Sequence, residues 1–126
     1  MATTTEFVKS REVREMTVTL TYDDTTSAEM FKLPDDARVI EWIVNVVTAF
    51  SGGTTELDVG TSDDSDYYVD GASLATLGLA AIGNTLQLPC TEMTAVTAIY
   101  MNVGADNTVG EVKVTCLFSM KTDKRF

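Results

Sequence analysis

Five aspartates stand close together near the middle of the chain and are the best candidates in the sequence for binding chemistry. They are Asp58, Asp63, Asp64, Asp66 and Asp70. Such a group suggests a calcium site, because hard cations take several carboxylate oxygens as ligands. The spacing differs from that of an EF-hand loop, in which acidic or amide residues alternate and a glycine and a distal glutamate follow. The sequence therefore favours a solvated acidic loop, and we expect no metal and no other cofactor.

The chain contains no histidine, which removes most of the familiar catalytic arrangements. A Ser-His-Asp triad, a Cys-His pair and an imidazole zinc ligand are all excluded. The sequence also lacks a glycine-rich phosphate loop and a nucleophile motif. A pair of carboxylates for glycoside hydrolysis depends on separation in space, so spacing along the chain leaves that arrangement open. We expect no catalytic residues and a protein that is not an enzyme.

Two tyrosines, two cysteines and one tryptophan complete the set of side chains with potential chemistry. Tyr67 and Tyr68 could stack on a sugar, but neighbours on a strand point to opposite faces, so one packed and one edge tyrosine are expected. Cys90 and Cys116 could form one disulfide, but without a C-x-x-C spacing they are expected to be buried thiols. Trp42 is expected in the core.

Charge is distributed unevenly along the 126 residues, which carry 9 Lys and Arg against 19 Asp and Glu, a net charge of −10. Residues 39–112 contain ten acidic residues and no Lys or Arg, whereas residues 113–126 contain four bases and one acid. An acidic chain is repelled by nucleic acid and by anionic membranes, so neither is an expected partner. We expect the acidic loops to face solvent and the less acidic ends to face a protein partner.

The length fits one domain. No apolar stretch is long enough for a transmembrane helix, and the N-terminus lacks the basic and apolar regions of a secretory signal, so we expect assembly in the cytoplasm. Residues 1–13 are polar and aperiodic apart from Phe7 and Val8. We predict a flexible N-terminal arm over residues 1–13 and a single β-sandwich domain over residues 14–126.

Alternation of apolar and polar residues predicts about eight strands. They are expected at residues 16–22, 31–33, 37–50, 55–60, 67–69, 84–88, 96–103 and 111–120. Between two of them, the segment Asp70–Gly78 has an aspartate cap, helix-forming residues and a terminal glycine, which predict one or two helical turns. The pattern indicates an all-β protein, a single-domain antiparallel β-sandwich that is jelly-roll-like and has at most one short helix.

Segment 37–50 is the one ambiguous element. Its polar residues Glu41, Asn45 and Thr48 also fall on a helical stripe, and turn residues flank it on both sides. Its many β-branched residues favour a long central strand instead. In that strand one face would be wholly apolar, formed by Ile40, Trp42, Val44, Val46 and Phe50.

Four stretches of the chain carry a resemblance to a known class of proteins. They are Phe31–Ile40 (FKLPDDARVI), Val44–Phe50 (VNVVTAF), Leu57–Thr61 (LDVGT) and Asp64–Val69 (DSDYYV). Together they resemble small β-sandwich virion proteins of tailed bacteriophages. That class includes head decoration or cement proteins, commonly trimers on the capsid surface, and also tail-associated and fibre-base modules.

The resemblance implies a structural virion protein, with no enzymatic activity, that binds the outer surface of a phage head and stabilises it by bridging coat subunits. The major capsid protein and further copies of this chain, as a homotrimer, would be the partners. The expected contact residues are Phe7 and Val8 in the arm and Lys121, Lys124 and Arg125 at the basic end. The alternatives are a tail or fibre-attachment component, or a host-surface glycan-binding module that uses the tyrosine pair and the acidic loop with calcium.

Overall fold

The computed structural model describes residues 11–79 and 93–121 of the chain. Within these ranges the chain forms eight β-strands and no helix, which confirms the prediction of an all-β protein. The strands are β1 (Arg11–Thr21), β2 (Ala28–Leu33), β3 (Arg38–Ser51), β4 (Glu56–Gly60), β5 (Val69–Ser73), β6 (Gly78–Leu79), β7 (Thr97–Val103) and β8 (Val109–Lys121). No helix in the same ranges is long and apolar enough to cross a membrane.

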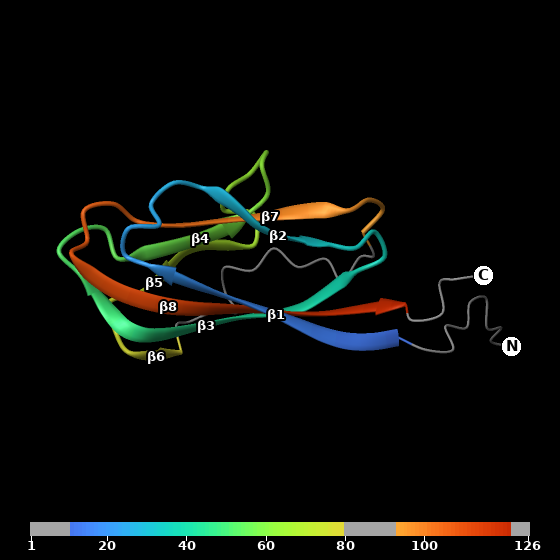
Figure 1. Cartoon of the computed structure of the whole chain (residues 1–126), viewed down its shortest axis with the longest axis horizontal. Helices are drawn as coiled ribbons and strands as arrows, with labels where there is room; N and C mark the ends of the chain where they lie inside the picture. The colour runs from blue at the N-terminus through green and yellow to red at the C-terminus, as the bar shows by residue number, and fades with distance from the viewer. Residues whose placement is uncertain (1–10, 80–92, 122–126) are drawn as a thin grey trace, which may run out of the picture.

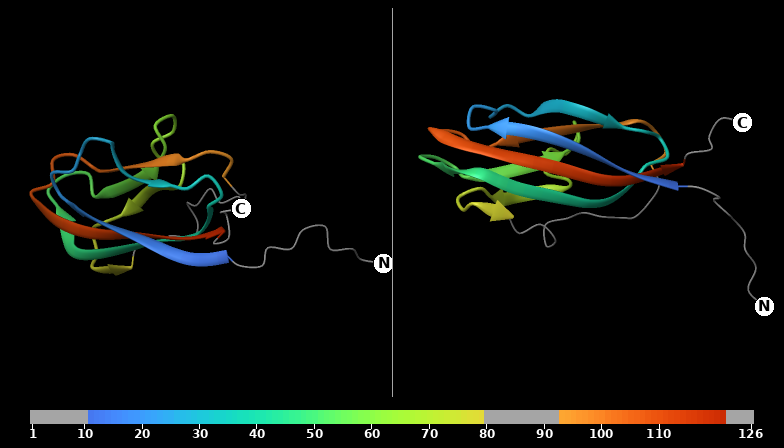
Figure 2. Two further views of the ribbon diagram at one scale, coloured as in Figure 1. Left: turned by 45° about the vertical axis from the view of Figure 1, so that its right-hand side comes forward. Right: turned by 60° about the horizontal axis from the view of Figure 1, so that its bottom comes forward.

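The strands form two four-stranded sheets that lie face to face (Figures 1 and 2). Sheet A has the order β1-β8-β3-β6, and sheet B has the order β2-β7-β4-β5. Antiparallel pairs join β1 to β8, β2 to β7, β3 to β6 and β4 to β5. The first strand thus pairs with the last, and each following pair lies inside the previous one in the sequence. This nested pairing is the strand order of an eight-stranded jelly roll. The predicted jelly-roll-like β-sandwich is therefore confirmed.

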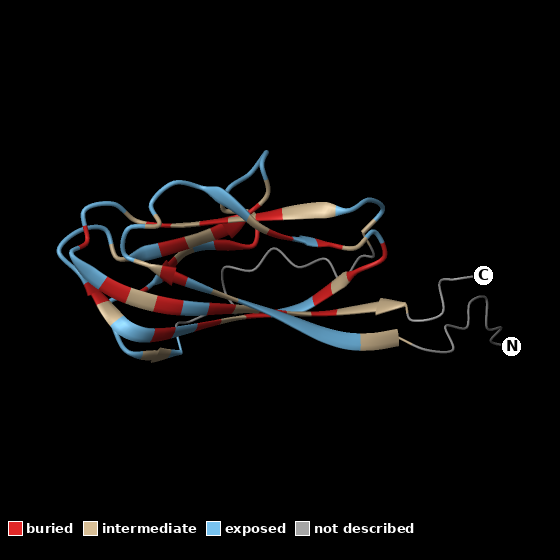
Figure 3. Cartoon of the chain, viewed as in Figure 1, coloured by how far each residue is buried: buried red, intermediate tan, exposed pale blue. Residues whose placement is uncertain are grey.

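Alternation along β8 shows how the sequence builds the core between the two sheets. Val112, Val114 and Cys116 are fully buried, whereas Lys113 between them is exposed. Successive side chains of a strand point to opposite faces, so this pattern gives β8 one face that is buried in the core and one face that is directed toward solvent. Figure 3 shows the same alternation of buried and exposed segments along the strands of both sheets. The core is a single layer of apolar side chains contributed by both inner faces.

The segment 37–50 is a strand, as the β-branched residues predicted, but its register contains irregularities. Its pairing with β8 shifts between Val39 and Glu41, so Ile40 is an extra residue in a β-bulge. As a result Val39 is buried and Ile40 is 46% exposed. The prediction that Ile40 lies on the apolar inner face is wrong, while the other four residues of that face, among them Trp42 and Phe50, are buried.

The predicted helical turns over Asp70–Gly78 are also wrong. Strand β5 occupies the first part of that segment and pairs with β4, where Leu57 stands opposite Ala72. Leu74 is fully buried and donates its N–H to the carbonyl of Thr55, while its own carbonyl accepts the N–H of Phe50. Pairing with neighbours and burial of Leu74 outweigh the local helix signals.

Two further strand boundaries differ from the prediction. The strand expected at 67–69 begins only at Val69, because Tyr67 and Tyr68 belong to the loop before β5. Strand β1 begins at Arg11, inside the range 1–13 that was predicted to be an arm. Residues 13–17 of β1 are exposed on both faces, so this part of the strand lacks the alternation of buried and exposed residues that reveals a strand. Residues 1–10 of the arm and the strand expected at 84–88 lie outside the described residues.

Candidate interface

The start of β1 and the end of β8 lie side by side at one end of the sandwich (Figure 1). Arg11 and Lys121 are direct cross-strand partners. The backbone N–H of Lys121 donates a hydrogen bond of 3.0 Å to Oδ2 of Asp36 in the loop between β2 and β3. The first and the last described residues, Arg11 and Lys121, therefore lie next to each other at one end of the sandwich. Of the expected contact residues, only Lys121 lies within the described ranges; Phe7, Val8, Lys124 and Arg125 lie outside them.

The guanidinium group of Arg11 ties this end together. Its Nη2 donates to the carbonyl oxygens of Asp36 (3.1 Å) and Ser119 (3.0 Å), and its Nε donates to Oγ of Ser119 (3.1 Å). Hydrogen bonds from a charged donor are stronger than bonds between neutral groups. Arg11 thus fixes the first residue of β1 to both β8 and the β2–β3 loop, which holds the terminal strands in a defined direction.

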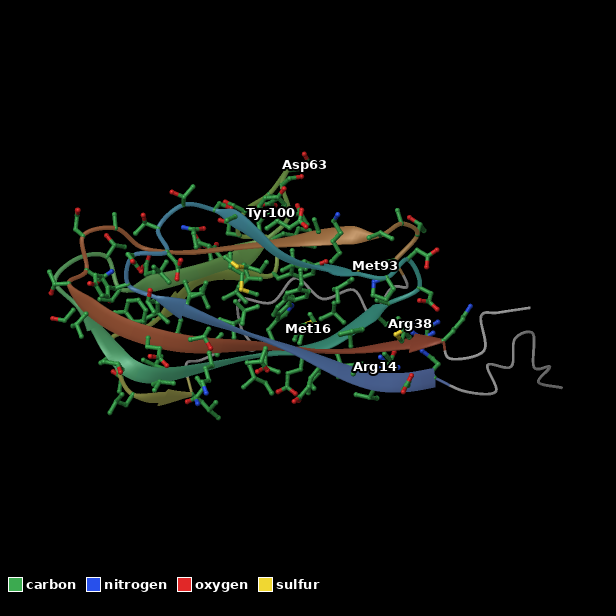
Figure 4. All side chains as sticks on the ribbon, in the orientation of Figure 1. Arg14, Met16, Arg38, Asp63, Met93 and Tyr100 are labelled. Atoms are coloured by element: carbon green, nitrogen blue, oxygen red, sulfur yellow. The ribbon has the colours of Figure 1, made fainter. Side chains whose placement is uncertain are left out.

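The two sheets differ in charge. The strands of sheet A contain five of the six Lys and Arg residues in the described ranges and four glutamates. The strands of sheet B contain Lys32 and four acidic residues, and the loops in the described ranges add only aspartates. In Figure 4, Arg14 and Arg38 lie near the end where β1 begins, whereas Asp63 projects on the side of sheet B. Charge is therefore distributed unevenly over the described residues: most of the cations lie on sheet A, and the surplus of anions lies on sheet B and the loops.

The outer face of sheet A also carries exposed apolar side chains. Val13 on β1 is 63% exposed and Leu79 on β6 is 71% exposed. The strand register places both on the face opposite the core, since Val13 stands beside Ser119 and Leu79 beside Asn45. Ile40 joins them because of its bulge. This face combines apolar groups with cations, a composition suited to contact with another protein.

The acidic residues of the loop and of sheet B are not gathered into a group of three or more carboxylates in the described residues. Asp58 stands directly opposite Asp70, and its Oδ1 accepts the N–H of Gly71 at 2.9 Å. Partial burial raises the pKa of Asp58; the bond from Gly71 lowers it, and the neighbouring carboxylates, including Asp66, raise it further. No group of three or more possible metal ligands occurs in the ranges that the structure describes.

Tyr67 and Tyr68 pack against the core and are not exposed on the surface as a pair. Tyr68 is buried and packs against Trp42 with ring centroids 5.4 Å apart, and Tyr67 is half-buried with its ring edge-on to Tyr68 at 4.9 Å. Trp42 is fully buried and also contacts Phe31 at 6.4 Å. The predicted core position of Trp42 and the predicted packing of one tyrosine are confirmed. Such aromatic contacts add stability beyond the area that they bury.

Cys116 is fully buried in β8 as a free thiol, as predicted. Burial raises the pKa of this thiol to about 12. A thiol with so high a pKa is unreactive, because the thiolate is the nucleophile and the metal ligand. Cys116 is therefore a core residue, and Cys90 lies outside the described residues.

Three solved structures of bacteriophage capsids contain a chain with this fold. One is in the capsid asymmetric unit of cyanophage Pam1, with 20% identity, a TM-score of 0.58 and coverage of 95% of this chain and 91% of that chain. Another is in the acidic stable capsid of Helicobacter pylori bacteriophage KHP30, with 18% identity, a TM-score of 0.56 and coverage of 90% and 95%. The third is in the capsid of Ralstonia phage GP4, with 18% identity, a TM-score of 0.55 and coverage of 96% and 90%.

These matches extend over at least nine-tenths of both partners, so the matched chains are of similar length to this one. At such identities the likeness defines the fold alone: an antiparallel jelly roll of the kind found in those capsids. No protein-family model and no curated protein matches the sequence.

Sequence reasoning missed the outer face of sheet A as a surface. One of its exposed apolar residues, Ile40, lies where the register of β3 shifts, and no feature of the sequence marks a bulge there. The start of β1 was missed for a different reason. An edge strand with both faces exposed to solvent shows no alternation of apolar and polar residues. The charged pattern of residues 11–15 was the signal available at that position.

Proposed function

We propose that this chain is a structural, non-enzymatic protein of a bacteriophage virion, and that it is a decoration or cement protein. It would bind the outer surface of the head as a homotrimer, contact the major capsid protein and stabilise the shell by bridging coat subunits. The observation that carries the proposal is the likeness of the whole fold to chains of similar length in three phage capsid structures. The resemblance of residues 31–69 to small virion proteins supports it independently of the fold.

The uneven charge of the two sheets supports an orientation on the shell. The strands of sheet B carry four acidic residues and only Lys32, so an acidic partner surface would oppose docking through sheet B. Sheet A offers cations and exposed apolar groups, and the end with Arg11 and Lys121 is where both terminal segments connect to it. We therefore propose that sheet A and this end face the shell, with Lys121 in the contact, while the acidic loops face solvent.

Many equivalent contacts would make such binding effective even when each contact is weak. Linked binding sites on an oligomer gain affinity through effective concentration, without any new contact. A trimer on a symmetric shell meets this condition. The rigid jelly roll, whose core contains residues from every strand of both sheets except β6, would keep the contact surfaces in fixed positions.

The proposal is tested by mixing the purified protein with phage heads that lack it, sedimenting the heads and measuring the bound chain. We expect saturable binding to heads and a higher temperature of head disruption. Binding to tails instead of heads would favour the tail or fibre station, and calcium-dependent binding to glycans without binding to heads would favour the glycan-binding module. Either result would overturn the proposal.

Two lysines provide a matched test of the orientation. Lys113 is exposed on β8 in sheet A, and Lys32 is exposed on β2 in sheet B. Lys113→Glu and Lys32→Glu make the same change of charge on opposite sides of the sandwich. We expect Lys113→Glu to weaken binding to heads and Lys32→Glu, which lies on the side proposed to face away from the shell, to leave it within about twofold. The reverse order would contradict the proposed orientation.

A further inference from the structure

Strand β1 forms one edge of sheet A, and no other strand of the described residues pairs with its outer side. Thr21 donates its N–H to Oδ2 of Asp24 (2.8 Å) and accepts the N–H of Asp24 (3.0 Å), so its backbone groups point away from β8. In an antiparallel pair these directions alternate with a period of two. Val13, Glu15 and Thr17 therefore also direct N–H and C=O away from β8. The structure assigns these groups no hydrogen-bond partner among the described residues.

Charged side chains occupy four of the first five positions of this edge, but two other features by which proteins protect an exposed strand, proline and bulges, are absent. Its pairing with β8 runs without a register shift from Arg11 to Thr21, and the strand contains neither proline nor a bulge. Residues 13–17 are all exposed. Figure 3 shows the exposed run along β1, and Figure 1 shows that the start of β1 extends beyond the strands of sheet B. A long, straight and exposed edge is a template for pairing with another strand.

The charges of residues 11–15 match those of a second copy. The sequence reads Arg-Glu-Val-Arg-Glu, so reversing its direction about Val13 exchanges every positive charge for a negative one. In an antiparallel pair with Val13 opposite Val13, Glu12 faces Arg14 of the second copy and Arg14 faces its Glu12. We propose that a second copy of this chain adds its β1 to β1 in this register, which joins the two A sheets into one continuous sheet.

The side chains on each face of β1 fit this pairing. Glu12 and Arg14 share one face and already form an exposed ion pair within the chain at 2.7 Å, so pairing exchanges the two internal contacts, one in each copy, for two between copies. Val13 on the other face is 63% exposed and would be covered by its counterpart. Arg11 would face Glu15, but its guanidinium already bonds to Ser119 and Asp36, so Glu12 and Arg14 carry the charge argument.

Neighbouring registers that keep the same hydrogen-bond directions are less favourable. One register places Glu15 opposite Glu15 and another places Arg14 opposite Arg14, and like charges directly opposite are destabilising. A third, with Met16 opposite Met16, contains no charge pair. The Val13 register is therefore the one that the sequence of β1 selects. It generates a two-fold axis, so the contact joins two copies and is distinct from the three-fold contact of the proposed homotrimer.

A charge exchange in solution tests the pairing without any phage component, so its outcome is independent of the proposed function. Either Arg14→Glu or Glu12→Arg alone places like charges opposite each other twice. We expect each to weaken concentration-dependent association by about tenfold in sedimentation equilibrium, and the double variant to restore it within about threefold. An equimolar mixture of the two single variants should also associate, because each supplies the charge that the other lacks. Equal association of wild type and both single variants would overturn the proposal, as would a wild type that does not associate.

Cysteine cross-linking tests the register. Facing residues in a hydrogen-bonded antiparallel pair have Cα atoms about 5.5 Å apart, which a disulfide can span. Val13→Cys should therefore cross-link to its counterpart under mild oxidation. Thr17→Cys is the matched control, since Thr17 is also exposed on the same edge but does not face itself in this register. Cross-linking of Thr17→Cys as fast as that of Val13→Cys would overturn the register.

Discussion

Asn107, in the loop between β7 and β8, holds two loops together at the end of the sandwich away from the start of β1. It is buried, with 7% exposure. Its Oδ1 accepts the N–H of Gly53 at 3.2 Å, and its Nδ2 donates to the carbonyl oxygens of Thr54 (2.8 Å) and Gly104 (3.1 Å). Asn107→Ala would leave one backbone N–H and two carbonyl groups without their partner in a place with little access to water.

The magnitude follows from these three bonds. A typical intramolecular hydrogen bond contributes about 0.5–1.5 kcal/mol, and an unsatisfied buried group costs more. We therefore expect Asn107→Ala to lower the free energy of unfolding by about 2–4 kcal/mol. With a urea dependence of about 2 kcal/mol/M, the middle of the range for a small domain, the unfolding midpoint should fall by about 1–2 M. Asn107→Asp should cost at least as much, because a carboxylate accepts from Gly53 but faces two carbonyl oxygens.

Urea unfolding followed by tryptophan fluorescence measures this effect, since Trp42 reports on the core. Asn102→Ala on β7 is the matched control, because its amide makes only one long contact of 3.5 Å to the carbonyl of Val103. The control should lie within about 0.5 kcal/mol of wild type. If Asn107→Ala and Asn102→Ala unfold at the same midpoint as wild type, the reasoning from buried hydrogen bonds is refuted.

Three further predictions concern stability and reactivity. Gly110→Ala should lower the free energy of unfolding by about 1–3 kcal/mol in urea titration, because its φ is +148° and an added Cβ would lie 2.4 Å from the ring of Phe50; an unchanged midpoint would contradict this packing. Asp58→Asn should raise the urea midpoint at neutral pH, because it removes a carboxylate whose charged form is disfavoured in the folded state. This gain in stability should vanish as the pH falls through the raised pKa of Asp58, since protonation removes the same charge in wild type. A gain that grows toward acid would contradict the direction of the pKa shift. Cys116 should resist alkylation in the folded protein and react in denaturant, as peptide-resolved mass spectrometry would show, because burial raises its pKa to about 12; rapid alkylation of the folded chain would place it at the surface.

The elements that could be predicted are those in which local pattern and tertiary structure agree. Strand β8 is one, because Val112, Val114 and Cys116 alternate with polar residues along its length. The sequence could predict a jelly-roll-like sandwich but not which strands pair with which. Pairing between strands far apart in the sequence produces no pattern in the residues of either strand. Segment 70–78 shows the opposite case, in which local helix signals gave way to the pairing of Ala72 with Leu57.

The candidate interface was less predictable than the fold, for two physical reasons. A bulge at Ile40 moves one apolar side chain from the core to the surface, and it depends on the register of two strands. The edge of β1 has water on both faces, so its first residues resemble a loop in sequence. The division of charge between sheets A and B, in contrast, follows from the charge segregation visible in the sequence once the strand order is known.

The central claim is that this chain decorates the outside of a phage head, and a cryo-electron microscopy reconstruction of heads mixed with the purified protein tests it most directly. The account predicts added density on the outer surface that fits the jelly roll as trimers. In that density, sheet A and the end with Arg11 and Lys121 should contact more than one coat subunit, and the loop with Asp63 should face solvent. Heads without added density, or density only at the tail, would contradict it.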